Sequence, residues 1–192
     1  MNDFRQQCID SLSAHTPQLS LQDLLHRSGH SDWPEYAPTE IVPGLYQGGT
    51  EDDDVLSIPS DDFRRRGRYP FDTVITLYAS AQPVPWGVEE LRFGFLDAGL
   101  DRADVTTVVR AARFAHQRWA DGATVLIRCQ AGMNRSGLIT ALVLMQAGLT
   151  AGQAITVIRD QRGKACLSNA NFVRWLVSHA SDALQTNTQN AA

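Results

Sequence analysis

The sequence contains few cysteines, and they are not arranged to bind zinc or to build a disulfide framework. Its 192 residues include Cys8, Cys129 and Cys166, and no two of these form a Cys-x-x-Cys pair. An odd number of cysteines without paired spacing is typical of a protein kept in a reducing compartment. We therefore expect a cytoplasmic protein without structural disulfides.

Long apolar runs are also absent. No window of 18 uninterrupted apolar residues occurs, which argues against a membrane span. Residues 1–25 contain no apolar stretch of the kind that marks a signal peptide, so we expect no secretory leader.

An excess of positive charge is lacking as well. The chain has 17 basic and 21 acidic residues, with a net charge of -4, and both signs are mixed along most of its length. A protein that binds nucleic acid through its overall charge would be basic, so we expect no nucleic-acid partner. A small anionic ligand is still compatible with this charge, because a few local hydrogen-bond donors are enough to bind it.

The sequence does contain enough apolar residues for a substantial core. Hydrophobic residues make up 43% of the chain, and its length fits one domain with a modest additional segment. We expect an N-terminal extension over residues 1–38, which is polar and interrupted by three prolines, a main domain over residues 39–184, and a frayed tail over residues 185–192. Within the extension, one short helix is predicted after Ser20, ending by Gly29.

Strand patterns and helix patterns alternate through the main domain. Compact apolar runs rich in β-branched residues predict strands, and apolar residues repeated every three to four positions predict helices. The predicted strands cover residues 40–49 (one strand or a strand pair), 71–79, 90–97 and 123–129. The predicted helices cover residues 104–120, 134–148, 150–163 and 169–184. This order predicts an α/β fold with a central, mainly parallel (mixed) sheet of about five strands flanked by helices.

The loop between the last predicted strand and the most apolar helix has an unusual composition. Cys129 ends the strand, Gly132 lies within the loop, and Arg135 opens the helix. In open α/β sheets, ligands bind beyond the carboxyl ends of the strands, and the first amides of a helix form an anion site together with the helix dipole. Gly132 permits a tight turn of these amides, and the guanidinium of Arg135 can bind two oxygens of one phosphate.

The same amides would favour the thiolate form of Cys129. A thiolate beneath a bound phosphate is placed to attack phosphorus and form a phosphocysteine, and the hydroxyl of Ser136 could hydrogen-bond the sulfur and help it to leave. The alternative is a buried free cysteine in front of an ordinary strand-to-helix turn. The cysteine-to-arginine spacing alone is weak evidence, but its combination with the strand, the glycine and the apolar helix favours the phosphate site.

Residues 129–136 resemble the C-x5-R-S/T signature loop of the cysteine-dependent protein tyrosine phosphatase superfamily, and of its dual-specificity phosphatases in particular. Residues 40–49 are similar to an early strand segment of dual-specificity members, and residues 169–172 to their late Asn-x-x-Phe element, so the likeness spans about residues 40–180. The resemblance implies that Cys129, Arg135 and Ser136 are catalytic. It implies that the phosphate is bound by Gln130, Ala131, Gly132, Met133, Asn134 and Arg135.

The general acid implied by the resemblance is an aspartate on a mobile loop, roughly thirty residues before the cysteine and just after a strand. Asp97 lies 32 residues before Cys129 and fits best. Asp101 is the second candidate, and Asp104 is more typical of a helix N-cap.

One residue departs from the family pattern. The family usually has histidine directly before the cysteine, where this chain has Arg128. The charge of Arg128 would still favour a thiolate if its guanidinium finds partners, and would otherwise be a costly buried cation. The substitution bears on the catalytic rate more than on the fold.

The activity implied by the resemblance is metal-independent hydrolysis of phosphate monoesters, with no metal or other cofactor. The substrate expected first is phosphotyrosine in proteins, with phosphoserine and phosphothreonine as further candidates. A phosphatase of inositol phosphates or other non-protein esters is an alternative, although family members of that kind tend to carry lysines in the loop and this loop has none. An inactive phosphate-binding module is a second alternative. The oligomeric state is left open.

Several other residues are weaker candidates for a functional role. His26 and His30 have helical spacing without further ligands, so solvation is favoured over metal binding. The acidic residues 51–54 are also expected to be solvated. The arginine-rich residues 64–68 either attract an acidic substrate or form an exposed face.

The remaining candidates lie in predicted helices or close to their ends. Arg159 and Arg162 share a helix face and either border the phosphate pocket or lie on the surface. Asn169 either positions a loop or a water, or caps the last helix. A free thiol is favoured for Cys166 over a disulfide with Cys129, and His116 is expected at the edge of the core.

Overall fold

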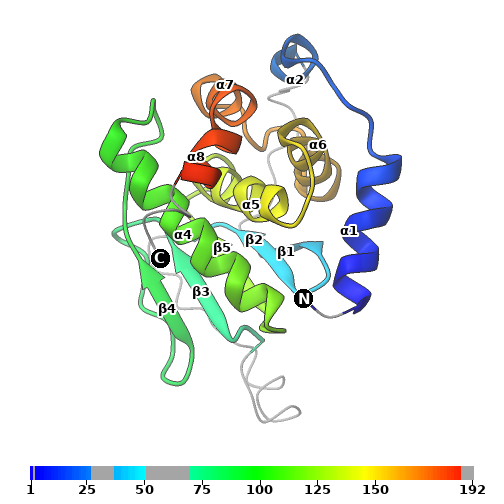
Figure 1. Ribbon diagram of the computed structural model, residues 1–192. Coiled ribbons are helices and arrows are strands. Elements are labelled where there is room, and N and C mark those ends of the chain that lie inside the picture. Colours follow the sequence, from blue (N-terminus) through cyan, green and yellow to red (C-terminus); the bar gives the residue numbers. More distant parts are fainter. Residues whose placement is uncertain (2, 27–36, 51–69, 187–192) are drawn as a thin grey trace.

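The computed structural model describes residues 1, 3–26, 37–50 and 70–186, and its centre is a five-stranded sheet (Figure 1). The strands lie in the order β1-β2-β5-β3-β4. Only β1 and β2 pair antiparallel, and the other three contacts are parallel, so the predicted mixed, mainly parallel sheet is confirmed. The strands span Thr39–Val42 (β1), Leu45–Gly48 (β2), Thr73–Thr76 (β3), Glu89–Arg92 (β4) and Val125–Arg128 (β5).

The central position of β5 determines where its following loop emerges. All four residues of β3 and of β5 are buried, as expected for apolar strands covered by neighbours on both sides. The last residues of three parallel strands stand side by side, since Arg128 is in register with Gly48 of β2 and with Thr76 of β3. The loop after Arg128 therefore starts in the middle of the carboxyl edge of the sheet.

Three helices form a layer against the sheet (Figure 1). The first, α4 (Arg102–Ala120), packs on β3 and β5. The second, α5 (Arg135–Gln146), packs on β5 and β2, and the third, α6 (Ala151–Arg162), packs on β1. Every residue of α5 from Ser136 to Leu144 is buried, which confirms the expectation that this apolar helix is central.

The predicted cap of α4 is wrong by three residues. Asp101, not Asp104, is the N-cap, and its carboxylate accepts a hydrogen bond from the amide of Asp104 at 2.8 Å. The Asp104 side chain in turn accepts from the amide of Asp101 and completes a capping box. An acidic residue suits both positions because both lie at the positive end of the helix dipole.

Two elements near the site are shorter than the sequence predicts. Strand β4 ends at Arg92 rather than near Asp97, which leaves residues 93–101 as a connection between β4 and α4. The last predicted helix divides into α7 (Ala170–Ser178) and α8 (Ala180–Thr186), because His179 leaves the helical conformation with φ −135°. The shorter strand places Asp97 on a loop instead of a strand end.

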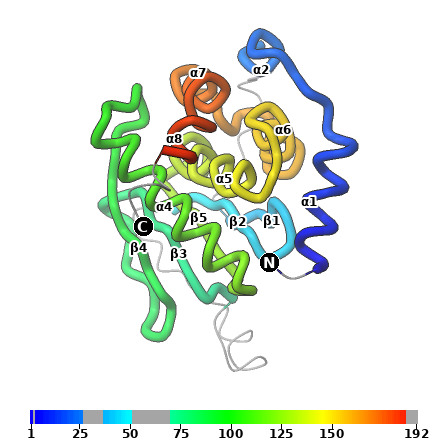
Figure 2. The backbone as a smooth tube through the Cα atoms, in the orientation of Figure 1, coloured from blue at the N-terminus to red at the C-terminus, as the bar shows by residue number. Residues whose placement is uncertain are grey.

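The N-terminal residues form two helices that pack beside α6 and α7 (Figure 2). Helix α2 (Leu21–His26) was expected, and the hydroxyl of its cap Ser20 accepts from the amide of Asp23. Helix α1 (Asp3–His15) was not expected, because only Arg5 and Ile9 of its residues are buried and its apolar pattern is weak. The division of the chain at residue 38 stays a prediction.

Arg5 fastens α1 to the end of α4. Its guanidinium donates to the carbonyl oxygen of Trp119 and, at 3.3 Å, to that of Gly122. These carbonyls lie at or beyond the last turn of α4, where a helix leaves acceptors without internal partners and where a cation is favoured. The guanidinium also lies 5.6 Å from the centre of the Trp119 ring.

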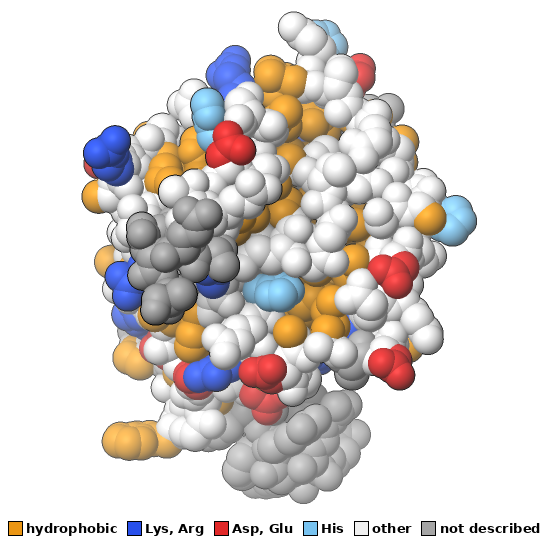
Figure 3. Space-filling model, in the orientation of Figure 1, with side chains coloured by type: hydrophobic (Ala, Val, Ile, Leu, Met, Phe, Trp, Pro, Cys, Tyr) orange, Lys and Arg blue, Asp and Glu red, His pale blue; other side chains and the backbone are white. Residues whose placement is uncertain are grey.

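Within the described parts of the chain, no helix is both long and apolar enough to cross a bilayer. On the face shown in Figure 3, basic and acidic side chains are interspersed, and the basic ones do not gather into one patch.

We expect the N-terminal helix to contribute to the stability of the whole domain. Substituting Ile9→Ala removes a side chain that is 1% exposed and should lower the free energy of unfolding by about 2–5 kcal/mol. Chemical denaturation of both variants would measure this, with Phe4→Ala as control, because Phe4 lies on the same helix and is 66% exposed. Equal stabilities of the two variants would contradict an integral α1.

Candidate active site

The loop between β5 and α5 turns its carbonyl groups outward, toward the elements that support it. The carbonyl oxygen of Gln130 accepts from the amide of Thr50 at 2.8 Å. That of Gly132 accepts two bonds, from Nε2 of Gln47 at 2.9 Å and from Nε of Arg162 at 2.8 Å. Both donor side chains are buried, so the direction of the Gly132 peptide is fixed by groups that water does not reach.

The amides of the loop have the opposite orientation. Among the described residues, the amides of residues 130–134 have no hydrogen-bond acceptor. Asn134 is the N-cap of α5, yet its side chain does not cap the helix. Gly132 has φ +69°, and a Cβ there would lie 2.4 Å from backbone atoms of Gly48 and Gly49, so only glycine fits. The loop is thus a cradle of donors at a helix N-terminus, the geometry that binds an anion.

The sulfur of Cys129 lies at the start of this cradle. Cys129 is 2% exposed, and its Sγ is 3.3 Å from Oγ of the fully buried Ser136, so the predicted contact between them exists. Cys129 and Cys166 are both free thiols, and no disulfide joins them. Burial raises the pKa of the Cys166 thiol to about 11, with the charge of Arg162 opposing that shift and the charge of Cys129 adding to it.

Arg135 reaches from the first turn of α5 across the carboxyl edge of the sheet. Its Nη1 donates to the carbonyl oxygens of Leu77 at 3.1 Å and of Phe95 at 3.5 Å, and its guanidinium carbon lies 5.8 Å from the Tyr78 ring centre. Its Nε is buried and has no hydrogen-bond partner among the described residues. The guanidinium is therefore held through Nη1, while its other nitrogens have no acceptor among the described residues and are left for a ligand.

Asp97, the first of the two candidate acids, contacts the loop directly. Its Oδ2 accepts from Nδ2 of Asn134 at 3.0 Å, and its Oδ1 accepts from Nδ2 of Asn169 at 2.7 Å. The side chain is exposed, as a group that meets substrate must be. Asp101 instead caps α4, so the structure brings Asp97 and not Asp101 to the loop through a hydrogen bond.

Arg128, which replaces the expected histidine, points away from the thiol toward β3 and β4. It is fully buried, and its Nε donates to the hydroxyl of Thr76 at 2.9 Å. Its Nη2 donates to the carbonyl oxygen of Gln82 at 2.6 Å and to Oε1 of Glu90 at 3.4 Å. The guanidinium of Arg128 therefore finds the partners that a buried cation needs, because its acceptors include both neutral oxygens and a carboxylate.

Glu90 is the anionic end of this cluster. Burial alone would raise the pKa of its carboxyl, but the hydrogen bond from Thr76 and the charges of Arg92 and Arg128 outweigh burial and hold that pKa below its usual value. Glu90 was not predicted as a partner, because 38 residues separate it from Arg128 and nothing in the sequence links them.

For Arg159 and Arg162, the alternative of a surface position is wrong. Neither residue lies on the surface, since each is 6% exposed. Neither turns toward the amide side of the loop: Arg159 donates to the carbonyl oxygens of Leu24, Cys166 and Leu167, and Arg162 supports Gly132 from behind. Burial lowers the pKa of the Arg162 guanidinium, although the charges of Cys166 and Cys129 oppose that effect.

Other candidates are absent from the site or lie outside the described residues. His30 and residues 51–54 and 64–68 fall outside the described part of the chain. His116 is half-buried as expected, and burial lowers its pKa. Within the described ranges, no group of three or more His, Cys, Asp or Glu side chains is arranged to hold a metal ion.

The sequence reasoning missed Gln47, which supports the loop from β2. Its side chain is fully buried and bonds Gly132 from 85 residues away. A signal was present, because a glutamine inside an apolar strand and directly before two glycines must find a buried partner.

We expect Arg128→Met to destabilise the fold, because it leaves buried hydrogen-bond acceptors without a donor. Thr76, Gln82 and Glu90 would each lose a donor, at a cost of about 1–3 kcal/mol in the free energy of unfolding. Adding Glu90→Gln should recover part of the loss. Since the pKa of Glu90 is lowered in the folded state, its contribution is present above its unfolded pKa and disappears as the pH falls through its folded pKa. Thermal unfolding between neutral and acidic pH measures both effects.

The matched control for this prediction is the exposed pair of Arg118 and Glu89. Arg118 donates two bonds of 2.7 Å to Glu89, one strand position away from Glu90. Arg118→Met should leave the stability nearly unchanged, because solvent screens an exposed pair. An equal loss in the two variants would contradict a special role of the buried cluster.

Solved structures of phosphatases share this fold. Human DUSP28 aligns with a TM-score of 0.60 and 20% identity, covering 77% of this chain and 95% of that protein. OH1 from the Orf virus, described as a tyrosine phosphatase, aligns with a TM-score of 0.59 and 21% identity, covering 82% and 95%. The human tyrosine phosphatase-like serine/threonine/tyrosine-interacting protein aligns with a TM-score of 0.61 and 18% identity, covering 82% and 100%. At these identities the likeness shows the fold.

In sequence, no curated protein matches the chain. The family model "Dual specificity phosphatase, catalytic domain" does match, over residues 104–182. That range runs from the first turn of α4 into α8 and contains the whole loop with Cys129 and Arg135. The family match over residues 104–182 and the shared fold together make the chain similar to the dual-specificity phosphatases among the cysteine-based phosphatases.

Proposed function

We propose that the chain hydrolyses phosphate monoesters through a phosphocysteine on Cys129, without a metal, and that its substrate is phosphotyrosine in proteins. Phosphoserine and phosphothreonine are further candidate substrates. The observation that carries the proposal is the 3.0 Å hydrogen bond between Asp97 and Asn134, because it joins an exposed carboxylate to the loop that starts at Cys129. An anion cradle, a nucleophile and a proton donor then form one site.

Binding of the substrate uses donors whose directions are already fixed. The amides of residues 130–134 and the guanidinium of Arg135 would bind the non-bridging oxygens of the phosphate. Neutral amides and one guanidinium supply the electrostatic stabilisation that a metal supplies in other phosphatases. Little reorganisation is needed, since the carbonyl of Gly132 is held from behind by Gln47 and Arg162.

In the first chemical step, the Cys129 thiolate attacks phosphorus. The new bond joins sulfur and phosphorus, and the bond between phosphorus and the ester oxygen breaks. Protonated Asp97 gives its proton to that departing oxygen, which leaves as a phenol or an alcohol. The carboxylate is exposed and tied to the loop, so it can stand over the bound phosphate.

In the second step, water attacks the phosphocysteine. Asp97, now ionised, accepts a proton from that water, and the sulfur–phosphorus bond breaks to release inorganic phosphate. The departing thiolate accepts a hydrogen bond from the hydroxyl of Ser136, which lies 3.3 Å from the sulfur.

The composition of the loop supports a protein ester as substrate. Apart from Arg135, residues 130–135 are uncharged, so no lysine is present for the additional phosphates of an inositol phosphate. Leu96, directly before Asp97, is 77% exposed and offers an apolar contact for an aromatic ring beside the proposed acid.

We expect Cys129→Ser to abolish turnover and to retain binding. The serine hydroxyl is a far poorer nucleophile at neutral pH than a thiolate, so kcat should fall on the order of 10⁴-fold or more, while the cradle is unchanged. Hydrolysis of p-nitrophenyl phosphate measures turnover, and phosphotyrosine, phosphothreonine and inositol phosphate substrates compare specificity. Metal-dependent turnover that survives Cys129→Ser would overturn the mechanism, and bound phosphate without any turnover by the wild type would favour an inactive binding module.

Asp97→Asn should lower kcat about 10²- to 10³-fold with little change in substrate binding, because it removes only the proton transfer. Asp101→Asn is the matched control, since asparagine is as good an N-cap as aspartate and α4 stays capped. Steady-state kinetics on phosphotyrosine peptide separates the two variants. If kcat fell in Asp101→Asn and not in Asp97→Asn, Asp101 would be the general acid instead.

A further inference from the structure

Both carboxylate oxygens of Asp97 are held by side-chain amides from two different elements. Asn169 at the start of α7 donates to Oδ1 at 2.7 Å, and Asn134 in the phosphate loop donates to Oδ2 at 3.0 Å. We propose that Asn134 and Asn169 form a clamp that holds the general acid in its working position before substrate binds, which makes both of them positioning residues for proton transfer. This inference rests on the proposed role of Asp97.

The orientation of the Asn169 amide is fixed by the helix that it caps. Its Oδ1 accepts from the amide of Asn171 at 3.0 Å, which is the N-cap bond of α7. With the oxygen committed to the helix, the NH₂ group must face the other way, where it meets Asp97 and, at 3.0 Å, the carbonyl oxygen of Ala98. The cap and the clamp therefore use opposite ends of one amide.

The orientation of the Asn134 amide is fixed in the same manner. Its Oδ1 accepts from the amide of Asn169 at 3.0 Å and from the hydroxyl of Ser168 at 3.3 Å, so its NH₂ group is turned to Asp97. Asparagine at an N-cap position ordinarily accepts from its own helix, and here it does not. Its side chain is used to connect the loop to Asp97 and α7, and the first amides of α5 stay available.

The clamp assigns different tasks to the two carboxylate oxygens. Oδ1 is bound from α7, outside the phosphate loop, and Oδ2 is bound from within it. A carboxylic acid that donates a proton carries it on one oxygen, and that oxygen must reach the ester oxygen of the phosphate. Oδ2 is the oxygen on the loop side, so it carries the proton. Asn169 then keeps its bond to Oδ1, and Asn134 gives up its bond to Oδ2.

A purely structural role for Asn169 predicts a different outcome from a positioning role. Loss of the cap would weaken α7 and lower the rate of hydrolysis of all substrates by the same factor. Loss of the clamp would slow only reactions that need a proton on the leaving group, and would lower kcat while leaving KM nearly unchanged, because phosphate is bound by other groups. The dependence of kcat on the leaving group is therefore the readout.

Asn169→Asp separates the cap from the clamp. Aspartate retains an oxygen for the amide of Asn171, so α7 stays capped. It also replaces the donor to Asp97 by a second carboxylate, which repels it. Asn171→Asp is the matched control, because it adds the same charge two residues later, and Asn171 is exposed.

The experiment compares phenyl phosphate, whose phenolate needs a proton to leave, with p-nitrophenyl phosphate, whose nitrophenolate leaves more readily. With the full chain, Asn169→Asp should lower kcat for phenyl phosphate at least about tenfold and for p-nitrophenyl phosphate several times less, with KM nearly unchanged and the unfolding midpoint preserved. Asn134→Ala should change the same ratio in the same direction. Asn171→Asp should behave as the wild type.

Two results would overturn the clamp and leave the proposed function standing. One is an unchanged ratio of the two rates in Asn169→Asp while Asp97→Asn does lower it. The other is an equal loss on both substrates together with a lower unfolding midpoint, which would make Asn169 only a cap. If Asp97→Asn itself left the ratio unchanged, the proposed acid would be wrong, and the clamp would fall with it.

Discussion

The carbonyl group of Gly132 is the point on which the site depends. A peptide has its carbonyl and its amide on opposite sides, so the loop can present amides to an anion only where its carbonyls find partners elsewhere. Gln47 and Arg162 supply two buried donors to this carbonyl, from β2 and from the last turn of α6. Strand, helix and loop are thereby joined at one oxygen, and the cradle keeps its shape before any ligand is bound.

Buried guanidinium groups form much of the support of the site. Arg128, Arg159 and Arg162 are each at most 6% exposed, and each donates to several backbone carbonyls or side-chain oxygens. A buried cation is costly without such partners, and these acceptors come from segments that the chain brings together only on folding. The side chain of Arg128, directly before the cysteine, bonds to Thr76 and Glu90 and so connects β5 to β3 and β4.

The sequence predicted what is local and missed what is distant. The strand, Cys129, the glycine turn and Arg135 lie within one short segment whose spacing has a direct physical meaning, and the apolar repeats gave the sheet and the central helix. The bonds from Asp97 to Asn134 and Asn169 span 37 and 72 residues, and no spacing rule reaches so far. Helix α1 was missed because it is polar on most sides, and the loop with Asp97 was assigned to a strand because its alternating phenylalanines imitate one.

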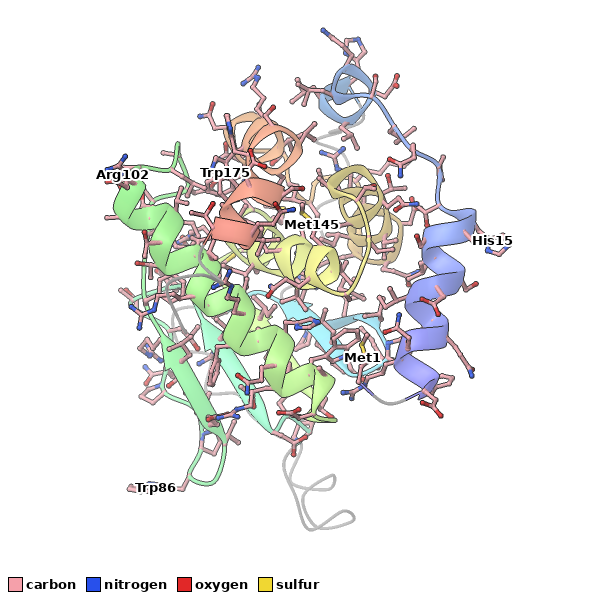
Figure 4. The ribbon with its side chains drawn as sticks, in the orientation of Figure 1. Met1, His15, Trp86, Arg102, Met145 and Trp175 are labelled. Carbon is pink, nitrogen blue, oxygen red and sulfur yellow. The ribbon has the colours of Figure 1, made fainter. Side chains whose placement is uncertain are left out.

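At the tip of the β3–β4 connection, Trp86 points away from the body of the protein, and 98% of its surface is exposed (Figure 4). A large aromatic residue is therefore not by itself a sign of a core position in this sequence.

Helix α6 has a different neighbour at each of its ends. At its start, Gln153 donates to the carbonyl oxygens of Ser13, in the last turn of α1, and of Thr16, directly after it, and at its end Arg162 holds Gly132. A helix of 12 residues is a stiff rod of about 18 Å. A displacement of this rod along its axis would act on α1 and on the loop after Cys129 together, so the N-terminal helix is mechanically connected to the candidate site.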